Sequence, residues 1–195
     1  MSKMGEKPCS VLVVSGSEKF DALVRKALTR GRFLMPGFHR NAASARRCLL
    51  EHEYDLVVIN CPLSDEFGHE LAADAALKWG ACVMMVVPAE VYDNVLEHVT
   101  DMGILALAKP ASQERLGHAI RYLTAIRSRI HELQQQVRKG AEKMEELRVV
   151  SKAKILLIEK RHMTEDEAHG YIGREAMDHG LTRKRVAQQI LEDLE

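Results

Sequence analysis

Paired cysteines are missing from this sequence of 195 residues. The four cysteines stand singly, mostly among apolar neighbours, at Cys9, Cys48, Cys61 and Cys82. Because no CxxC pair exists, the sequence supports neither a zinc knuckle nor a thioredoxin-type redox site. We therefore expect buried, reduced thiols in a reducing compartment.

Long hydrophobic runs and an excess of either charge are also missing. No apolar stretch approaches the ~20 residues that span a bilayer, and residues 1–8 are polar, with no hydrophobic signal-peptide core. The 28 basic and 28 acidic residues cancel, so any nucleic-acid contact must use a local patch. We expect a cytoplasmic protein with no membrane partner.

Catalytic motifs are absent as well. The sequence has no nucleophile–base set, no glycine-rich phosphate loop and no metal-ligating cluster. His162, His169 and His179 do not make a metal signature, so surface or capping roles are expected for them. The sequence therefore predicts neither an enzyme nor a protein that carries a cofactor or a metal.

Short apolar runs alternate with amphipathic stretches between residues 9 and 123. Continuous apolarity predicts strands that are covered on both faces, as in a parallel sheet. The runs cover residues 9–14, 55–59, 82–87 and 104–108, and a fifth strand near 33–39 is weakly marked. The amphipathic stretches cover residues 20–29, 43–52, 67–78 and 91–101, and Ser112 is suited to cap a last helix. This order predicts a doubly wound α/β domain.

The spacing of these strand ends resembles the receiver domain of two-component response regulators, over nearly all of residues 9–123. The resemblance implies an acidic Mg²⁺-binding pair after the first strand and a phosphoacceptor aspartate at the end of the third. It also implies a Thr or Ser at the end of the fourth strand and a Lys-Pro pair at the end of the fifth. Most of these positions are changed here: Ser15 and Gly16 replace the acidic pair, Asn60 the phosphoacceptor and Pro88 the hydroxyl residue, and only Lys109-Pro110 matches.

The replacements predict a pseudo-receiver, which has the fold without the phosphorylation site. Mg²⁺ prefers carboxylate ligands, and an amide such as Asn60 cannot act as the nucleophile that forms an acyl phosphate. Phosphorylation of the nearby Asp65 is disfavoured because it lies beyond the strand end, and we interpret Asp65-Glu66 as a solvated acidic loop. Lys109 is either structural or a donor to Asn60.

A narrow apolar stripe with heptad spacing runs from residue 126 to residue 147. Its members are Ile126, Ile130, Leu133, Val137, Met144 and Leu147, with Gly140 completing the spacing. Such a stripe predicts a parallel coiled-coil homodimer within one long helix from Ser112 to about Arg161. Gly140 weakens the seam, since glycine costs about 1 kcal/mol against alanine in a helix. The alternative is a long surface helix that packs on its own domain.

Three helical segments are expected in the last 45 residues. Beyond Ser151 the apolar face broadens, which predicts burial in a small helical domain; it comprises Ala153, Ile155, Leu156, Leu157 and Ile158. Thr164 and Glu167 form a capping box that starts the second helix, and Gly180 is expected to end it. The third helix begins at Leu181-Thr182 and turns Val186, Ala187, Ile190, Leu191 and Leu194 inward.

Residues 150–194 resemble the ANTAR domain, an RNA-binding antitermination module. The matching motif runs from Ala153 to Ala168, and Arg174-Glu175-Ala176-Met177 and Val186-Ala187 follow at the family's spacing. Many members have glycine where Ile155 stands here. The order of parts resembles antitermination regulators of the amidase-operon type, in which a sensor partner rather than a kinase exerts control.

Net charge does not predict RNA binding by this segment, because residues 151–195 contain eight basic and nine acidic residues. A local cluster could bind RNA instead. The candidate RNA-binding residues are Lys154, Lys160, Arg161, Arg174, Arg183, Lys184 and Arg185. A solvated face is the alternative for these charges. His179 and Tyr171 are candidate stacking groups, although Tyr171 falls on the apolar stripe and is assigned to the core.

The sequence thus predicts a pseudo-receiver over residues 1–123, a coiled-coil dimerisation helix over 124–150 and an ANTAR-like RNA-binding domain over 151–195. The resemblance implies a dimer that binds paired stem-loops in nascent mRNA and prevents a terminator from forming. The alternative function is a dimeric protein-interaction adaptor with a receiver-like docking domain.

Overall fold

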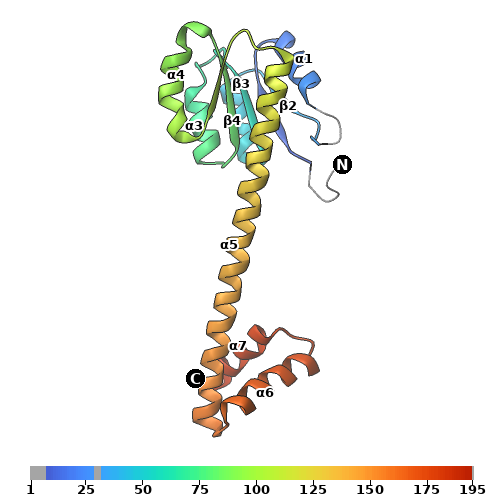
Figure 1. Cartoon of the computed structure of the whole chain (residues 1–195), viewed down its shortest axis with the longest axis vertical. Coiled ribbons are helices and arrows are strands. Elements are labelled where there is room, and N and C mark those ends of the chain that lie inside the picture. Colours follow the sequence, from blue (N-terminus) through green and yellow to red (C-terminus); the bar gives the residue numbers. More distant parts are fainter. Residues whose placement is uncertain (1–7, 29–31, 195) are drawn as a thin grey trace. The chain divides into compact units, whose positions relative to one another are not determined.

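A computed structural model of the chain describes residues 8–28 and 32–194. It divides into two compact units, residues 1–130 and residues 131–195, and Figure 1 labels most of their helices and strands. Residue 29, with which the first expected helix ends, and most of the polar N-terminal segment lie outside the described residues.

The first unit is built on a five-stranded parallel sheet with the order β2-β1-β3-β4-β5. The strands are β1 (Val11–Val14), β2 (Gly37–His39), β3 (Leu56–Asn60), β4 (Cys82–Val87) and β5 (Leu105–Ala108). Every residue of β1 and β3 is buried. The apolar runs are therefore continuous because helices cover both faces of the sheet, as predicted.

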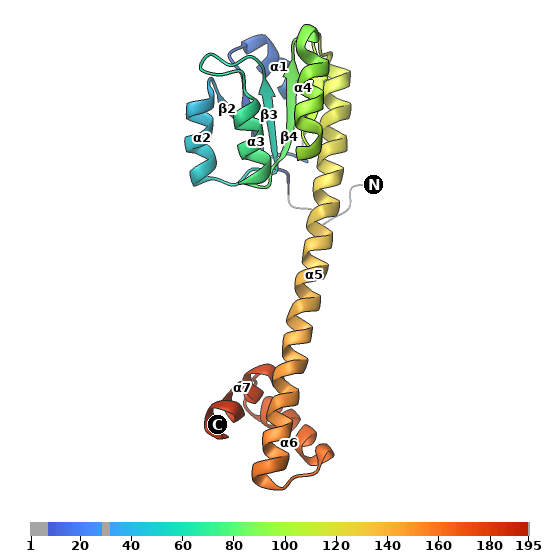
Figure 2. The ribbon, with the colours of Figure 1, turned by 90° about the vertical axis from the view of Figure 1, so that its left-hand side faces the viewer.

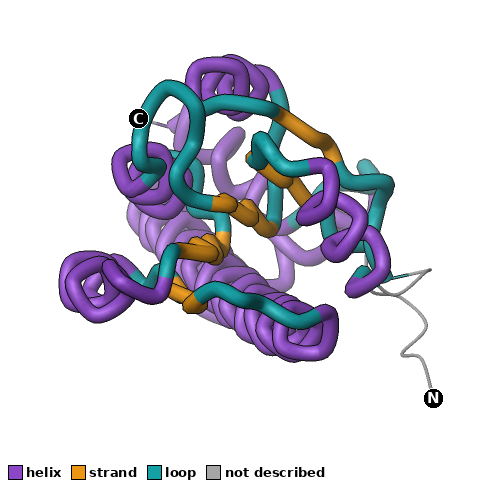
Figure 3. The backbone as a smooth tube through the Cα atoms, turned by 90° about the horizontal axis from the view of Figure 1, so that it is seen from above, coloured by secondary structure: helices purple, strands orange, loops and turns teal. Residues whose placement is uncertain are grey.

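Helices form a layer on each face of the sheet (Figure 3). Alternate strand residues point into two separate cores. One face is covered by α2 (Ala42–Glu51), α3 (His69–Leu77) and α4 (Tyr92–Val99). The other is covered by α1 (Glu18–Ala27) and the start of α5. Two short 3₁₀ turns flank α4, η1 (Ala89–Val91) and η2 (Thr100–Met102). The predicted doubly wound, receiver-like fold is confirmed.

Helix α5 (Gln113–Arg161) is one uninterrupted helix of 49 residues, as the sequence predicts. It begins where the Ser112 Oγ accepts a hydrogen bond from the Arg115 amide at 3.2 Å. Leu116 and Ile120 are fully buried against the sheet. The helix continues through Gly140, where open space surrounds the position of a missing side chain.

The second unit contains the later part of α5 together with α6 (Glu165–Asp178) and α7 (Arg183–Leu194) (Figure 2). The predicted capping box is present: the Thr164 Oγ1 accepts from the Glu167 amide, and the Glu167 carboxylate accepts from the Thr164 amide at 2.8 Å. Gly180, at φ +61°, ends α6 as predicted. Its amide and that of Leu181 bond back to carbonyls of the last turn, which is a Schellman arrangement.

The apolar face of α5 in this unit differs from the sequence prediction. Val149, Ala153 and Leu157, spaced by four residues, are buried against α6 and α7. Ile155 and Ile158, which were expected in the same core, are 51% and 37% exposed. A helix turns by about 100° per residue, so one packed stripe cannot include residues 155 and 158 along with 153 and 157. The prediction was therefore wrong for Ile155 and Ile158, whereas it is confirmed for Ala153 and Leu157.

None of the described helices, α5 included, combines the length and the apolarity that crossing a membrane requires.

Candidate functional site

Neutral side chains occupy the carboxyl edge of the sheet where a receiver would hold its metal and phosphate. Asn60 ends β3 and is buried, and its Nδ2 donates to the Ser15 Oγ at 3.0 Å. The same hydroxyl accepts from the Ser17 amide at 3.0 Å. The Asn60 Oδ1 is buried without a hydrogen-bond partner. The edge is thus a small amide–hydroxyl cluster that begins at the end of β1.

The residues at this edge do not fit Mg²⁺. Ser15, Gly16 and Asn60 offer no carboxylate, which is the ligand that this ion prefers. Asp21 on α1 is a buried carboxylate, but it pairs with Arg40 at 2.7 Å. The Arg40 guanidinium also donates to the Ser15 carbonyl at 3.0 Å. A cation already neutralises this carboxylate, so it is not available to a metal ion.

Lys109 has a structural contact rather than the alternative contact with Asn60. Its Nζ donates to the backbone carbonyl of Cys61, directly after β3. Burial lowers the pKa of Lys109. Burial also raises the pKa of the Cys61 thiol to about 12, which disfavours the reactive thiolate. All four cysteines are free.

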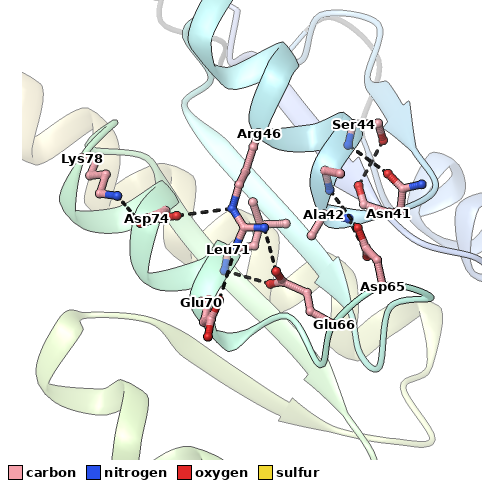
Figure 4. A network of polar contacts seen from close by, with 11 residues as sticks. Asn41, Ala42, Ser44, Arg46, Asp65, Glu66, Glu70, Leu71, Asp74 and Lys78 are labelled. Carbon is pink, nitrogen blue, oxygen red and sulfur yellow. Dashed lines mark hydrogen bonds and ion pairs between the residues drawn. The ribbon is translucent and has the colours of Figure 1, made fainter.

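The Asp65-Glu66 loop is fastened to two helices and is not a loose acidic loop (Figure 4). The Asp65 carboxylate accepts hydrogen bonds from the Ala42 and Ala43 amides, both at 2.9 Å, at the start of α2. Glu66 pairs with Arg46 of α2 at 2.7 Å and accepts from the Leu71 amide of α3 at 3.1 Å. Asp65 is exposed, as a solvated acidic loop predicts, but the sequence interpretation did not include these contacts with α2 and α3.

Arg46 extends this network to the outer side of α3. Its guanidinium also lies 3.3 Å from Asp74, which in turn pairs with Lys78 at 2.8 Å (Figure 4). The two helices and the loop that follows β3 are therefore linked by charge-assisted hydrogen bonds. The loop that follows β3 is thus held by α2 on one side and by α3 on the other.

Three arginines each lie against a residue of α6 in the second unit. The Arg161 guanidinium lies 5.5 Å from the centre of the Tyr171 ring and donates to its hydroxyl at 3.2 Å. The Arg174 Nη1 lies 3.3 Å from the point where a Cβ on Gly170 would stand. The Arg183 Nη2, from the start of α7, lies 3.9 Å from the corresponding point on Gly173. We call Arg161, Arg174 and Arg183 the α6 arginines.

The other candidate RNA-binding residues have varied surroundings. Lys154 pairs with Glu165 at 2.9 Å and its side chain is 21% exposed. Lys154 was expected to face solvent, but its ammonium group is held in this ion pair. Lys160 and Arg185 are exposed, whereas Lys184 is half-buried. Sequence reasoning placed the basic cluster at the start of α7 and missed the two glycines that bring Arg174 and Arg183 close to the α6 backbone.

Tyr171 and His179, the candidate stacking groups, also have partners. Tyr171 is half-buried at the margin of the helical core, with its hydroxyl bonded to Arg161. His179 lies 3.4 Å from Glu175 one turn earlier. Among the described residues, no three His, Cys, Asp or Glu side chains gather in a way that could hold a metal ion.

The heptad stripe on α5 is largely uncovered. Ile126 is half-buried, and Ile130, Leu133, Val137, Met144 and Leu147 are all exposed. Val137 is 73% exposed. Near the start of the stripe, Arg127 still belongs to the first unit, and its guanidinium lies 3.5 Å from the Asp55 carboxylate. Large exposed apolar surfaces are typical of sites that bind another molecule.

Comparisons with known proteins agree for both units. Residues 139–191 match the ANTAR domain family. The chain is 35% identical over 144 residues to the transcriptional regulatory protein PdtaR of Mycobacterium tuberculosis, which covers 73% of this chain and 70% of that protein. The same match is found in a second strain of that organism.

Solved structures of receiver domains resemble the first unit. A signal receiver domain of an HD domain-containing protein from Pseudomonas fluorescens aligns with a TM-score of 0.57 at 20% identity, over 68% of this chain and 97% of that one. The chemotaxis response regulator CheY4 of Vibrio cholerae aligns with a TM-score of 0.52 at 15% identity, over 60% of this chain and 99% of that one. At these identities the likeness shows the fold alone.

A receiver-like sheet followed by a separate helical module defines a regulatory protein of the response-regulator type. More particularly, the chain belongs to the family of ANTAR-domain transcriptional regulators with a receiver-like N-terminal domain. Both resemblances inferred from the sequence are confirmed.

We expect Asp65→Asn to remove a pH-dependent part of the stability of the first unit. The Ala42 and Ala43 amides lower the pKa of Asp65. A carboxyl whose pKa is lowered on folding stabilises the protein above its unfolded pKa of about 3.9, and this contribution is lost as pH falls through the folded value. The variant should therefore be less stable than the wild type at pH 7, and the difference should shrink below about pH 4.

Urea unfolding followed between pH 3 and pH 8 by the fluorescence of Trp79, which packs at the margin of the α3 side of the core, measures this difference. Asp93→Asn, which neutralises an acidic residue in the first turn of α4, is the matched control. A difference between wild type and Asp65→Asn that stays constant across this range would contradict the capping role.

Proposed function

We propose that the chain is a dimeric RNA-binding regulator of transcription antitermination that is not controlled by aspartyl phosphorylation. Family membership supports the antitermination role. The observation that carries RNA binding is that the α6 arginines, all within the ANTAR-matching residues 139–191, lie against α6. Its partners would be stem-loops in nascent mRNA and a sensor or regulator protein.

The α6 arginines suit RNA for three physical reasons. A guanidinium presents planar, paired donors that match phosphate oxygens and can stack on bases. Gly170 and Gly173 have no side chain, so the guanidinium groups of Arg174 and Arg183 lie near the helix backbone, where an RNA strand could approach closely. The Tyr171 ring beneath Arg161 adds an aromatic surface. Lys160, Lys184 and Arg185 would widen the positive surface. Lys154 would contribute less, because its charge is paired with Glu165.

Replacing Arg174 and Arg183 with alanine should weaken RNA binding without unfolding the second unit. Loss of two charge-assisted contacts should lower affinity at least about tenfold. Each lost phosphate contact should also flatten the log–log salt dependence by about 0.7 for single strands. The measurement is a fluorescence titration at several salt concentrations, with RNA selected on the wild-type protein from a stem-loop library.

Arg138→Ala with Lys139→Ala is the matched control, because it removes the same charge from an exposed part of α5 in the same unit. The control should keep wild-type affinity. An equal loss of RNA affinity in both double variants would show that overall charge, and not these two arginines, determines binding. Failure of the wild-type protein to enrich any RNA would favour the adaptor function instead.

The exposed heptad stripe supports a parallel homodimer. Its residues keep the 4,3 spacing that two helices need for knobs-into-holes packing. Parallel pairing would bring both C-terminal units to the same end of the coil, where two stem-loops could be bound together. The boundaries proposed for the coil are residues 124–150, between the receiver-like domain of 1–123 and the RNA-binding domain of 151–195.

Ile130→Asp combined with Leu133→Asp should produce monomers. Two carboxylates would have to be buried without partners in the seam, which should raise the dimer dissociation constant at least about a hundredfold. Ser128→Asp with Gln135→Asp adds the same charge away from the stripe and should leave the dimer intact. Sedimentation velocity measures the outcome, and a dimer unchanged by the first pair of substitutions would exclude this seam.

Incubation with acetyl phosphate and Mg²⁺ should not phosphorylate the chain. Asn60 supplies no nucleophilic carboxylate, and Ser15 and Gly16 supply no acidic metal ligands. Intact-mass spectrometry would detect the addition of one phosphate. Phosphate mapped before Leu123 would contradict the proposal, and its loss in Asp65→Asn would identify the loop carboxylate as the acceptor.

A further inference from the structure

Helix α5 has two different apolar faces where it passes through the second unit. Val149, Ala153 and Leu157 pack against α6 and α7. Ile155 and Ile158 remain 51% and 37% exposed. At about 100° per residue, the centres of the two faces lie about 170° apart around the helix. The helices α6 and α7 therefore leave the second face open.

This open face continues the heptad stripe without a change of side. Met144, Leu147, Ser151, Ile155 and Ile158 follow one another at spacings of 3, 4, 4 and 3 residues. These steps add up to 14 residues, which is two heptads, so Ile158 keeps the heptad register. Ile155 stands one residue beyond the strict heptad position. Met144 and Leu147 are themselves 68% and 57% exposed.

Polar residues on this stretch do not interrupt the seam. Ser151 has a small side chain, which allows two helix backbones to approach closely. Lys154 would be the next residue of a strict heptad, but its ammonium group is drawn away to Glu165 at 2.9 Å. Ile155, one residue further on, offers apolar surface in its place.

We propose that the dimer seam does not end at Leu147 but extends through Ile155 to Ile158, so that a second copy of this chain covers the exposed isoleucines. The inference rests on the proposed parallel dimer and deepens it. Two α5 helices would pair back to back within the C-terminal units, and α6 and α7 of each copy would lie on the outside. The α6 arginines of the two copies would then form separate surfaces, one for each stem-loop.

Continuity with the coil identifies the occupant as a second copy. The exposed isoleucines continue the stripe that is proposed to pair with a second copy. Any other partner would therefore have to compete with that second copy for the same face of the helix. The extension also removes from water the two exposed isoleucines of this stretch of α5.

Cysteine cross-linking of the full chain tests the inference. In a parallel, in-register dimer, equivalent seam positions face each other. Ile158→Cys should therefore form disulfide-linked dimers on mild oxidation, as should Leu147→Cys within the seam proposed first. Glu159→Cys is the matched control, because this exposed neighbour lies about 100° away around the helix. The wild-type chain gives the background from the native cysteines. We expect at least a tenfold higher cross-linked fraction for Ile158→Cys than for Glu159→Cys.

The three variants separate the possible failures. If Leu147→Cys cross-links and Ile158→Cys does not, the extension is wrong while the dimer stands. If neither cross-links, the parallel dimer fails and the extension fails with it. Equal cross-linking by Glu159→Cys would also overturn the inference. As a second measurement, Ile155→Ala with Ile158→Ala should raise the dimer dissociation constant at least tenfold in sedimentation equilibrium. An unchanged constant would contradict the proposal.

Discussion

Both units of this protein depend on a single helix that supplies part of each hydrophobic core. Leu116 and Ile120 of α5 pack on the sheet of the first unit, and Ala153 and Leu157 pack on α6 and α7 in the second. The helix between them has no core of its own and keeps its apolar stripe in water. An isolated helix gains little stability from propensity alone, and Gly140 lowers it further. Pairing of two such helices would stabilise this middle stretch, which is the physical reason for the dimer proposed above.

Much of the fold could be predicted because its signals are local. Buried strands have continuous apolar sequences, and Thr164 and Glu167 stand at the spacing that a capping box requires. The edge strand β2 was only weakly marked because it lacks such a local signal. Gly37–His39 is only three residues long and half-buried throughout, so neither continuous apolarity nor alternation marks it.

The missed contacts depend on residues that are distant in sequence. Asp65 binds amides that lie 22 and 23 residues earlier, and Lys109 binds a carbonyl 48 residues earlier. Residue spacing cannot reveal such pairs without the fold. The error at Ile155 has a different cause, since an apolar residue on an amphipathic helix predicts burial but does not say whether another helix of the same chain or a second chain buries it.

The neutral sheet edge limits how the proposed regulator can be controlled. A phosphorylated receiver changes its state when a covalent charge is added at the strand end, but here Asn60 is bonded to Ser15 and the following loop is tied to α2 and α3. In the proposed function, control would come instead from a partner that binds one arrangement of the protein more tightly than another, because a ligand with equal affinity for both shifts nothing. A tenfold preference corresponds to about 1.4 kcal/mol. The partner's contacts with the receiver-like surface, rather than chemistry at Asn60, would therefore set the strength of the signal.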